Sequence, residues 1–561
     1  MGNKYQDLLI EWCDALVDAQ ITDGEDFGGF RCESCGFPHG RADNAVYPFV
    51  CAYDITGDDK YLAAAERAMV FRRRLLQPSG AMQNDFSSAW EGITAFSAIG
   101  LLKTLLYYRD KLPIALGKEI ETSAASAVRW VYDHMTVGFP AYINYYCAAS
   151  LVNALAAEYY HDDKYTLRAK ALLQYCLGLF TENGLLAGEG KPHDDRSPKG
   201  CLPIDIGYIA EESMPCLLHA AHFLGDEDLL RTLRARARDL LAFFLPDGGW
   251  DNSFGVRNNK WTYYGSRTSD GCIGAFAMLA KEDGIFGEAA ERTYRILRAC
   301  THGGLLYGGM HYAENRQKPC IHHTFCHAGA LADAIHEGVN ESKAILPCDA
   351  DGVGYKYFPE IDTYKIHVGK YLATLTGYDY ATHHFTNGAA HASGGTLSLL
   401  YKKDVGALIA GSVYRYVCTE PNNMQLPAGD VNHASLLLRA ECEKDGGLYA
   451  TCLDRAAMME VYTDGDEIVA KVRSRCVSED GTAAKEVPQV DMSYRFTSDG
   501  VKLRVSRVGE KVRLILPMIE QTGEIITSAP HTIRPIFFLT GGFSAKEYSF
   551  PLGEDVEITI R

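Results

Sequence analysis

Four acidic residues in the first half of the chain stand beside aromatic and amide residues, a combination that could cleave a glycosidic bond. Hydrolysis of that bond needs one carboxylic acid to protonate the leaving oxygen and a second carboxylate to activate water or to attack the sugar. Glu91 and Glu212 are the predicted acid/base pair, with Glu211 and Asp270 as further candidates. Residue type alone does not assign which is the acid and which the base.

Polar and aromatic residues near these carboxylates could bind a sugar and an acidic group on it. Arginine holds a carboxylate through two parallel hydrogen bonds, and Trp and Tyr offer flat faces for a sugar ring. Read singly, several of these residues also fit helix caps or a solvent-exposed helix face. The predicted binding residues are Asn44, Asn144, Tyr208, Trp261, Arg267, His322 and His323.

The elements that must position these residues form a helical repeat. Up to about residue 345 the sequence is Ala/Leu-rich with helical periodicity, as in YLAAAERAMVFRRRLL. Acidic turns near residues 57, 161 and 225 precede helices, and glycine-containing loops occur near 80, 138, 184, 248 and 303. A period of about 50–60 residues holds two helices and two loops, which predicts about six helical hairpins. Six hairpins can close into an (α/α)6 toroid; an open solenoid is the alternative.

In a toroid, the glycine-containing loops gather at one mouth, and the helix after each loop belongs to the inner ring. The first turn of each inner helix then offers free N–H groups and the positive end of the helix dipole, which favour a carboxylate or sugar hydroxyls. The candidate residues fall on six such junctions in phase with the repeat. This regularity favours one shared site over unrelated helix caps.

After residue 345 the pattern changes to short β-branched and aromatic runs such as EIVAKVRSRCV. Asp-Gly pairs at 445, 464, 480 and 499 recur between these runs, as hairpin turns would. We therefore predict an (α/α)6 toroid as the catalytic domain over residues 1–345 and an antiparallel β-sandwich over residues 346–561.

Composition limits the partners and the compartment. The 72 acidic and 55 basic residues give a net charge of −17, which argues against nucleic acid or an anionic membrane as a partner. No secretory leader and no apolar run of membrane-spanning length is evident, and the 17 cysteines are an odd number, so a cytoplasmic protein with reduced thiols is expected. A homodimer is compatible with the sequence, but nothing in it indicates one.

Two clusters of cysteine and histidine could hold zinc if the first and last hairpins meet across ring closure. The first contains Cys32, Cys35 and His39; the second, CIHHTFCH, contains Cys320 and Cys326 with three histidines. Structural zinc usually needs four such ligands, and reduced packing cysteines are the favoured interpretation, so no cofactor is expected. The histidines of THHFTNGAAH, at 383, 384 and 391, could reach the mouth or belong to a polar loop.

The motifs WEGITAF, DIGYIAEESMP, WTYYGSRTSDG and GGTLSLLYKKDVGALIAGSVYRY resemble the heparinase II/III-like superfamily. The resemblance covers most of the chain and implies a toroid followed by a β-sandwich. Members of this superfamily include uronate-specific polysaccharide lyases. The chain also resembles the β-glucuronidases of glycoside hydrolase family 154.

The resemblance leaves the reaction open, because fold does not fix chemistry. In the lyases, an Asn at an inner-helix start neutralises the uronate carboxylate and a Tyr on the next hairpin transfers protons; Asn144 and Tyr208 fit these roles. His322 or His323 could supply a base, although Tyr145 stands where His often follows the Asn.

The extra carboxylates have no role in a lyase, and both they and the net charge of −17 would repel a polyanion. We therefore expect a β-glucuronidase-like glycoside hydrolase that releases a terminal uronic acid from an oligosaccharide or glycoside. The alternatives are a polysaccharide lyase acting by β-elimination and a non-catalytic glycan-binding protein.

Overall fold

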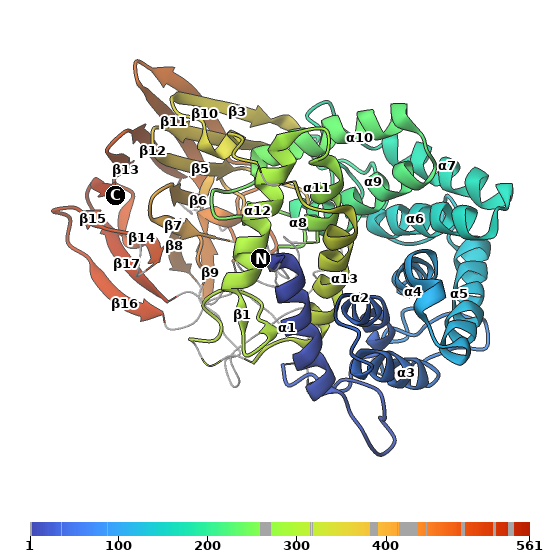
Figure 1. Cartoon of the computed structure of the whole chain (residues 1–561). Helices are drawn as coiled ribbons and strands as arrows, with labels where there is room; N and C mark the ends of the chain where they lie inside the picture. Colours follow the sequence, from blue (N-terminus) through green and yellow to red (C-terminus); the bar gives the residue numbers. More distant parts are fainter. Residues whose placement is uncertain are drawn as a thin grey trace.

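The computed structural model places a helical domain beside a β-domain (Figure 1). It describes residues 3–34, 36–86, 88–258, 271–314, 316, 318–340, 342–381, 391–411, 413–414, 435–444, 446–483, 489–519, 523–536 and 544–561.

The helical domain is an (α/α)6 toroid, as predicted. Each inner helix contacts the next one around the ring, and α13 returns to α2, so the ring is closed and the open solenoid is wrong. The outer helices are α1 (Lys4–Ala19), α3 (Lys60–Arg72), α5 (Ile114–His134), α7 (Asp163–Leu177), α10 (Glu227–Leu240) and α12 (Gly284–Ala299). The inner helices are α2 (Val46–Thr56), α4 (Thr94–Tyr108), α6 (Ile143–Tyr160), the continuous segment α8 (Ile206–Tyr208), η3 (Ile209–Ser213) and α9 (Met214–Phe223), then α11 (Ile273–Leu279) and α13 (Ile321–Glu337).

The two rings differ in the way their sequences are buried. Inner helix α6 is buried at nearly every position from Ile143 to Ala156, because it has neighbours on all sides. Outer helix α10 buries Leu230, Leu233, Ala237 and Leu240, a single stripe at helical spacing. The acidic turns of the sequence are N-termini of outer helices; Asp226, for example, accepts a hydrogen bond from the backbone N–H of Leu229.

Contacts between the first and last hairpins close the ring. The indole N–H of Trp12 donates to Thr301 Oγ1 at 2.9 Å in the buried core, and Lys4 pairs with Glu291 at 2.5 Å. Both contacts join segments nearly 300 residues apart in the sequence, so the toroid is one cooperative unit rather than a row of independent repeats.

The β-domain is an antiparallel β-sandwich, as predicted, and its strands form three larger sheets. The first sheet has the order β3 (Val353–Phe358), β4 (Thr363–Val368), β5 (Tyr371–Thr376), β6 (Thr396–Lys402) and β7 (Gly406–Ala410). The second has the order β16 (Thr532–Ile536), β17 (Ala545–Leu552), β14 (Gly509–Ile519), β8 (Arg439–Lys444) and β9 (Gly447–Ala450). The third has the order β10 (Met458–Asp464), β11 (Glu467–Arg475), β12 (Gln489–Thr497), β13 (Gly500–Val505), β18 (Val556–Ile560) and β15 (Ile525–Ile526).

A separate small hairpin, β1 (Thr301–His302) with β2 (Leu305–Leu306), belongs to the toroid. The Asp-Gly pairs at 464 and 499 form the turns of β10–β11 and β12–β13. Helix α13 ends at Glu337 and β3 begins at Val353; the division at residue 345 itself stays a prediction. No helix in the described ranges is long and apolar enough to cross a membrane.

The first sheet of the β-domain packs on loops of the toroid. Glu360 accepts hydrogen bonds from Thr181 Oγ1 (2.6 Å) and Asn183 Nδ2 (3.0 Å), and buried Asp251 pairs with Lys365 of β4. The backbone N–H of Ile204 donates to the Tyr378 hydroxyl at 3.0 Å. The sheet thereby fixes the loops that lead into α8 and α11.

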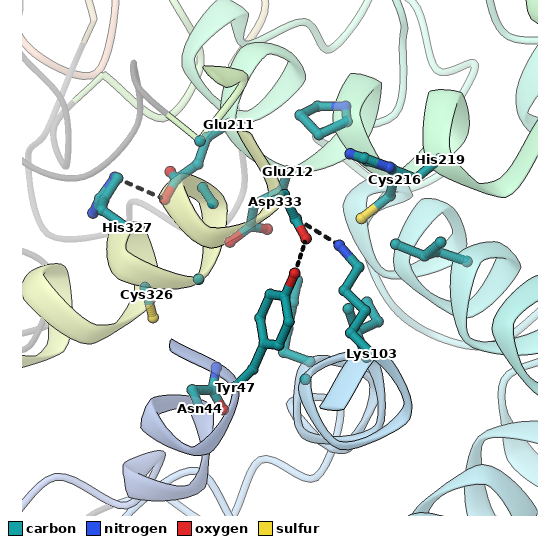
Figure 2. A pocket seen from close by; sticks show the side chains of 18 of the residues that line it. Asn44, Tyr47, Lys103, Glu211, Glu212, Cys216, His219, Cys326, His327 and Asp333 are labelled. Carbon is teal, nitrogen blue, oxygen red and sulfur yellow. Dashed lines mark hydrogen bonds and ion pairs between the residues drawn. The ribbon is translucent and has the colours of Figure 1, made fainter. Parts of the chain in front are cut away.

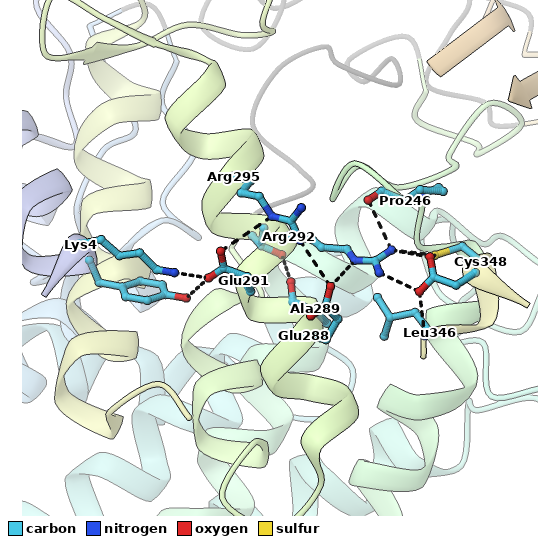
Figure 3. A network of polar contacts seen from close by, with 12 residues as sticks. Lys4, Pro246, Glu288, Ala289, Glu291, Arg292, Arg295, Leu346 and Cys348 are labelled. Carbon is cyan, nitrogen blue, oxygen red and sulfur yellow. Dashed lines mark hydrogen bonds and ion pairs between the residues drawn. The ribbon is translucent and has the colours of Figure 1, made fainter. Parts of the chain in front are cut away.

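Arg292 of α12 ties the toroid to the segment that enters the β-domain (Figure 3). Its guanidinium forms two hydrogen bonds with Asp349, at 2.8 and 2.7 Å, and a third with Glu288 at 2.8 Å. The side chain is only 12% exposed, so these charge-assisted bonds are largely shielded from water.

Replacing Arg292 by Ala is expected to lower the free energy of unfolding by about 3 kcal/mol, because it leaves Asp349 without its arginine and Glu288 with only its longer pair to Arg295 at 3.4 Å. Arg231→Ala is the control, since Arg231 is 67% exposed and its pair with Asp228 should contribute less than about 1 kcal/mol. Denaturant unfolding measures both; equal losses would contradict the assigned role of Arg292.

Candidate active site

A cavity of about 160 Å³ lies on the axis of the toroid, and five of the inner-helix segments contribute to its wall. Figure 2 shows His327 pointing toward Glu211, and Tyr47 and Lys103 both pointing toward Asp333. The lining of the cavity also includes Arg41, Asn44, Phe96, Cys216, His219, Gly271 and Cys326. These groups come from several turns of the inner helices, so side chains of different hairpins converge inside the ring; within the described chain, Asn144 and Tyr208 are not among the lining residues.

Asn144 and Glu212 meet between two neighbouring inner helices. The Asn144 side-chain amide donates to Glu212 Oε2 at 2.6 Å, and both side chains are buried. Asn144 lies in the first turn of α6, while Glu212 lies in η3, a single turn of π-helix between α8 and α9. π-Helical turns often occur at functional sites because they redirect side chains within a continuous helix.

The π-helical turn has a local cause in the sequence. Pro215 has no N–H to donate to the carbonyl of Glu211 four residues earlier, so regular α-helical bonding cannot continue there. That carbonyl faces Gly271, where a Cβ atom would come within 2.6 Å of the Glu211 oxygen. Glycine at 271 therefore permits the close approach of the two chain segments.

The guanidinium of Arg257 packs against the ring of Tyr208. The Arg257 guanidinium carbon lies 3.6 Å from the centroid of the Tyr208 ring and 5.1 Å from that of Tyr142. Arg257 Nη1 donates to Glu189 Oε2 at 2.8 Å, and the Glu189 side chain is fully buried. Burial raises the pKa of Glu189 to about 7, although Arg257 opposes this shift.

Asp205 connects these groups through three hydrogen bonds. Its Oδ1 accepts from the backbone N–H of Tyr208 and from Asn252 Nδ2, both at 3.1 Å, and its Oδ2 accepts from the backbone N–H of Arg257 at 2.8 Å. A Cβ atom at Gly255 would lie 2.1 Å from Asn252 Oδ1 and 2.5 Å from Asp205 Oδ2, so only glycine fits there. Burial raises the pKa of Asp205, and the surrounding N–H donors lower it in part.

The histidines of α13 occupy different positions along the helix. His327 Nε2 lies 3.8 Å from Glu211 Oε1, and its Nδ1 is 2.7 Å from the carbonyl of His323. His322 stacks on His39, with ring centroids 4.2 Å apart, next to the ring-closing segment. All four rings are buried. His322 and His323, which were predicted to bind sugar, are thus packed in the wall, while His327 faces the cavity.

Glu91 lies apart from the cavity, although it was predicted to form the acid/base pair with Glu212. It is half-buried just before α4, and it is absent from the lining of the cavity within the part of the chain that the structure describes. Its neighbour Trp90 donates to the Tyr145 hydroxyl at 2.7 Å. Burial, reinforced by Glu212, raises the pKa of Tyr145 to about 12, so this phenol stays protonated near neutral pH.

The remaining predicted residues divide into two groups. Asn44, Glu211 and Glu212 line the common cavity, with Asn144 bonded to Glu212 and Tyr208 one turn before it. Asp270, Trp261 and Arg267 lie outside the described residues, as do Cys35, His383 and His384.

Sequence reasoning missed four charged residues of the site: Glu189, Arg257, Lys103 and Asp333. Lys103 and Asp333 form an ion pair of 2.5 Å at the cavity, where Asp333 also accepts from the Tyr47 hydroxyl at 3.0 Å. A lysine and an aspartate in the middle of Ala/Leu-rich inner helices were the available signal, because such positions otherwise require apolar or small residues. Glu189 and Arg257 sit in irregular loops, where the sequence offers no periodicity.

The two cysteine clusters do meet across ring closure, with Cys32 Sγ 3.9 Å from Cys320 Sγ. Nevertheless, no group of three or more His, Cys, Asp or Glu side chains among the described residues is arranged to hold a metal ion. Most of the 15 described cysteines are buried. The zinc hypothesis therefore gains no support from this part of the chain.

Comparison with known proteins assigns the chain to a family. The family model described as Ulvan lyase N-terminal domain matches residues 9–347, and the model described as Ulvan lyase C-terminal domain matches residues 355–534. The chain belongs to the ulvan lyase family. A curated relative, the broad-specificity ulvan lyase of Formosa agariphila, is 35% identical over 541 residues, which cover 92% of this chain and 82% of the relative.

The fold has a solved counterpart in the crystal structure of heparinase III. The two structures align with a TM-score of 0.55 at 11% sequence identity, over 99% of this chain and 84% of that one. The predicted likeness to the heparinase II/III-like superfamily is therefore confirmed. The refinement towards glycoside hydrolase family 154 finds no support in these matches.

The predicted glycoside hydrolase of β-glucuronidase type is wrong, because the family models and the curated relative are lyases. The structure supplies the physical reason. Glu212 binds Asn144 and Glu211 faces His327, so these carboxylates have structural partners and are not superfluous in a lyase. The net charge also misled, since a sum over the whole surface does not describe the field inside one pocket, where nearby groups dominate.

His219 gives a test of the electrostatics of the cavity. Neither ring nitrogen has a hydrogen-bond partner among the described residues, and burial, with Lys103 nearby, lowers the pKa of His219 to about 4. Between its ordinary value near 6.5 and about 4, the unfolded chain binds a proton that the folded protein does not, so this residue costs stability as the pH falls through that window.

His219→Gln should therefore reduce the loss of unfolding free energy between neutral pH and pH 4, by up to about 3 kcal/mol at 1.4 kcal/mol per pKa unit. Exposed His531, changed to Gln, is the matched control and should leave the pH dependence unchanged. Denaturant unfolding across this range measures both, and parallel curves for wild type and His219→Gln would contradict the assignment.

Proposed function

We propose that the protein is a polysaccharide lyase that cleaves a uronic-acid-containing polysaccharide by β-elimination. The observation that carries the proposal is the position of Asn144 and Tyr208 on the first turns of adjacent inner helices, in a chain of the ulvan lyase family. The curated relative is named for its action on ulvan, which makes ulvan the first substrate to test.

Elimination requires removal of the proton at C5 of the uronate and loss of the oxygen at C4. The electrons of the C5–H bond form the C4–C5 double bond as the C4–O bond breaks, and the leaving oxygen takes up a proton. Negative charge develops on the uronate carboxylate during this step, so hydrogen-bond donors aimed at it lower the barrier.

Asn144 is the proposed donor to that carboxylate. One of its two amide N–H groups is held by Glu212, which fixes the orientation of the side chain, and the other is the proposed donor to substrate. The positive end of the α6 dipole adds to the attraction.

Tyr208 is the proposed proton carrier, taking the C5 proton as phenolate and returning a proton to the leaving oxygen. His322 or His323 stays the alternative base predicted from the sequence, although neither is among the described residues that line the cavity. A non-catalytic glycan-binding role is less suited to this arrangement, because binding alone does not need a phenol stacked under a buried arginine.

The decisive assay incubates the purified protein with ulvan, heparan sulfate and a glucuronan, and records the ultraviolet absorbance of the C4–C5 unsaturated uronate. We expect this band to grow with at least one polymer. We expect no release of para-nitrophenol from a para-nitrophenyl β-glucuronide. Free saturated uronic acid without the band would overturn the proposal, and binding without any product would favour the glycan-binding alternative.

Tyr208→Phe and Asn144→Ala are each expected to lower kcat by about 10²-fold or more, because each removes a group that acts in the transition state. Tyr165→Phe, on outer helix α7, is the control for loss of a phenol and should keep full activity. Glu91→Gln should also stay within about threefold of wild type, since an acid/base role for Glu91 belonged to the hydrolase. Strong loss in Glu91→Gln with little loss in Tyr208→Phe would reverse these assignments.

A further inference from the structure

The close packing of Arg257 on Tyr208 suggests more than structural support. The guanidinium carbon lies 3.6 Å from the ring centroid, and the Arg257 side chain is only 11% exposed. A cation over an aromatic face interacts most strongly when water is excluded. Loss of the phenol proton would place a negative charge directly beside this cation, so Arg257 favours the phenolate form of Tyr208.

Two carboxylates fix Arg257 at this position. Its side chain is held by Glu189 at 2.8 Å, and its backbone N–H is held by Asp205 at 2.8 Å. The second oxygen of Glu189, Oε1, is buried and has no hydrogen-bond partner among the described residues. Glu189 is therefore a counter-ion whose charge is poorly solvated, and any change in its charge is felt by Arg257.

The other charged groups around Tyr208 oppose its ionisation. Asp205 caps the helix on which Tyr208 stands, Glu212 follows one turn later, and both carboxylates interact electrostatically with Glu189. Tyr142 borders the same guanidinium at 5.1 Å. Among the described groups, Arg257 is thus the cation seen against the Tyr208 ring, and it also acts on the buried carboxylates Glu189 and Asp205.

We propose that Arg257 is a positioning residue for proton transfer, holding positive charge against Tyr208, and that Glu189 tunes this effect as its counter-ion. The inference rests on the proposed lyase function, in which Tyr208 must lose and regain a proton. It goes further by predicting that substitutions of Arg257 and of Glu189 shift the pKa of the Tyr208 phenol in opposite directions.

Removing the cation and removing its counter-ion should have opposite effects. Arg257→Met should move the ascending limb of the kcat/KM pH profile to higher pH by about one unit or more, because the phenolate loses its cation. Glu189→Gln should move it to lower pH, because Arg257 then acts without neutralisation. Arg257→Lys keeps the charge and should shift the limb less than Arg257→Met does.

Two further variants control for folding and for the loss of an arginine. The double variant Arg257→Met with Glu189→Gln leaves neither charge unpaired, so it should fold and place the limb between those of the single variants. Arg168 stacks on Tyr132 at 4.4 Å between outer helices, and Arg168→Met should leave the profile unchanged.

A purely structural role for Arg257 would lower activity at all pH values without displacing the limb. A role in binding the substrate carboxylate would raise KM with the limb unchanged. Either result, or shifts of the same sign in Arg257→Met and Glu189→Gln, would overturn the inference.

The ionisation of Tyr208 can also be followed without turnover. In protein labelled with ¹³C at tyrosine Cζ, the resonance missing from Tyr208→Phe reports this phenol, and its titration midpoint should rise in Arg257→Met and fall in Glu189→Gln. If wild type makes no unsaturated product, the proposed function fails while this titration still decides the role of Arg257; unchanged midpoints overturn that role even in an active lyase.

Discussion

The arrangement of the candidate site depends on one buried carboxylate, Asp205. It begins the helix that carries Tyr208, and it binds both the side chain of Asn252 and the backbone of Arg257. A buried carboxylate is costly unless its oxygens are hydrogen-bonded, so the chain around it can adopt few other conformations. The Tyr208 ring and the Arg257 guanidinium lie together because the backbone N–H groups of both residues are bound to the same carboxylate.

The rest of the fold maintains this local arrangement. The closed inner ring brings the first turns of its helices to one mouth, and the first sheet of the β-domain fixes the loops on either side of α8 through Asp251 and Tyr378. The toroid thus orients the side chains of the candidate site, and the β-domain holds the loops between the inner and outer helices in place. Neither domain alone contains all of these contacts.

Repeat spacing was enough to predict the toroid, because each hairpin must bury one face against its neighbours and the period follows from that need. The positions of Asn144 and Tyr208 at helix starts followed from the same spacing. The reaction did not, since the roles of Glu211 and Glu212 depend on partners from other hairpins, His327 and Asn144. Arg257 and Glu189 were missed because loop residues far apart in sequence gain meaning only when the fold brings them together.

Ring closure has a consequence for the order of events during folding. Trp12 can bind Thr301 only after nearly the whole toroid has been synthesised. Until then, part of the apolar face of α1 stays exposed to solvent. Contacts of such long sequence separation slow folding and prolong the exposure of intermediates to aggregation. The candidate active site is therefore completed late in folding, when the first and last hairpins of the toroid dock against each other.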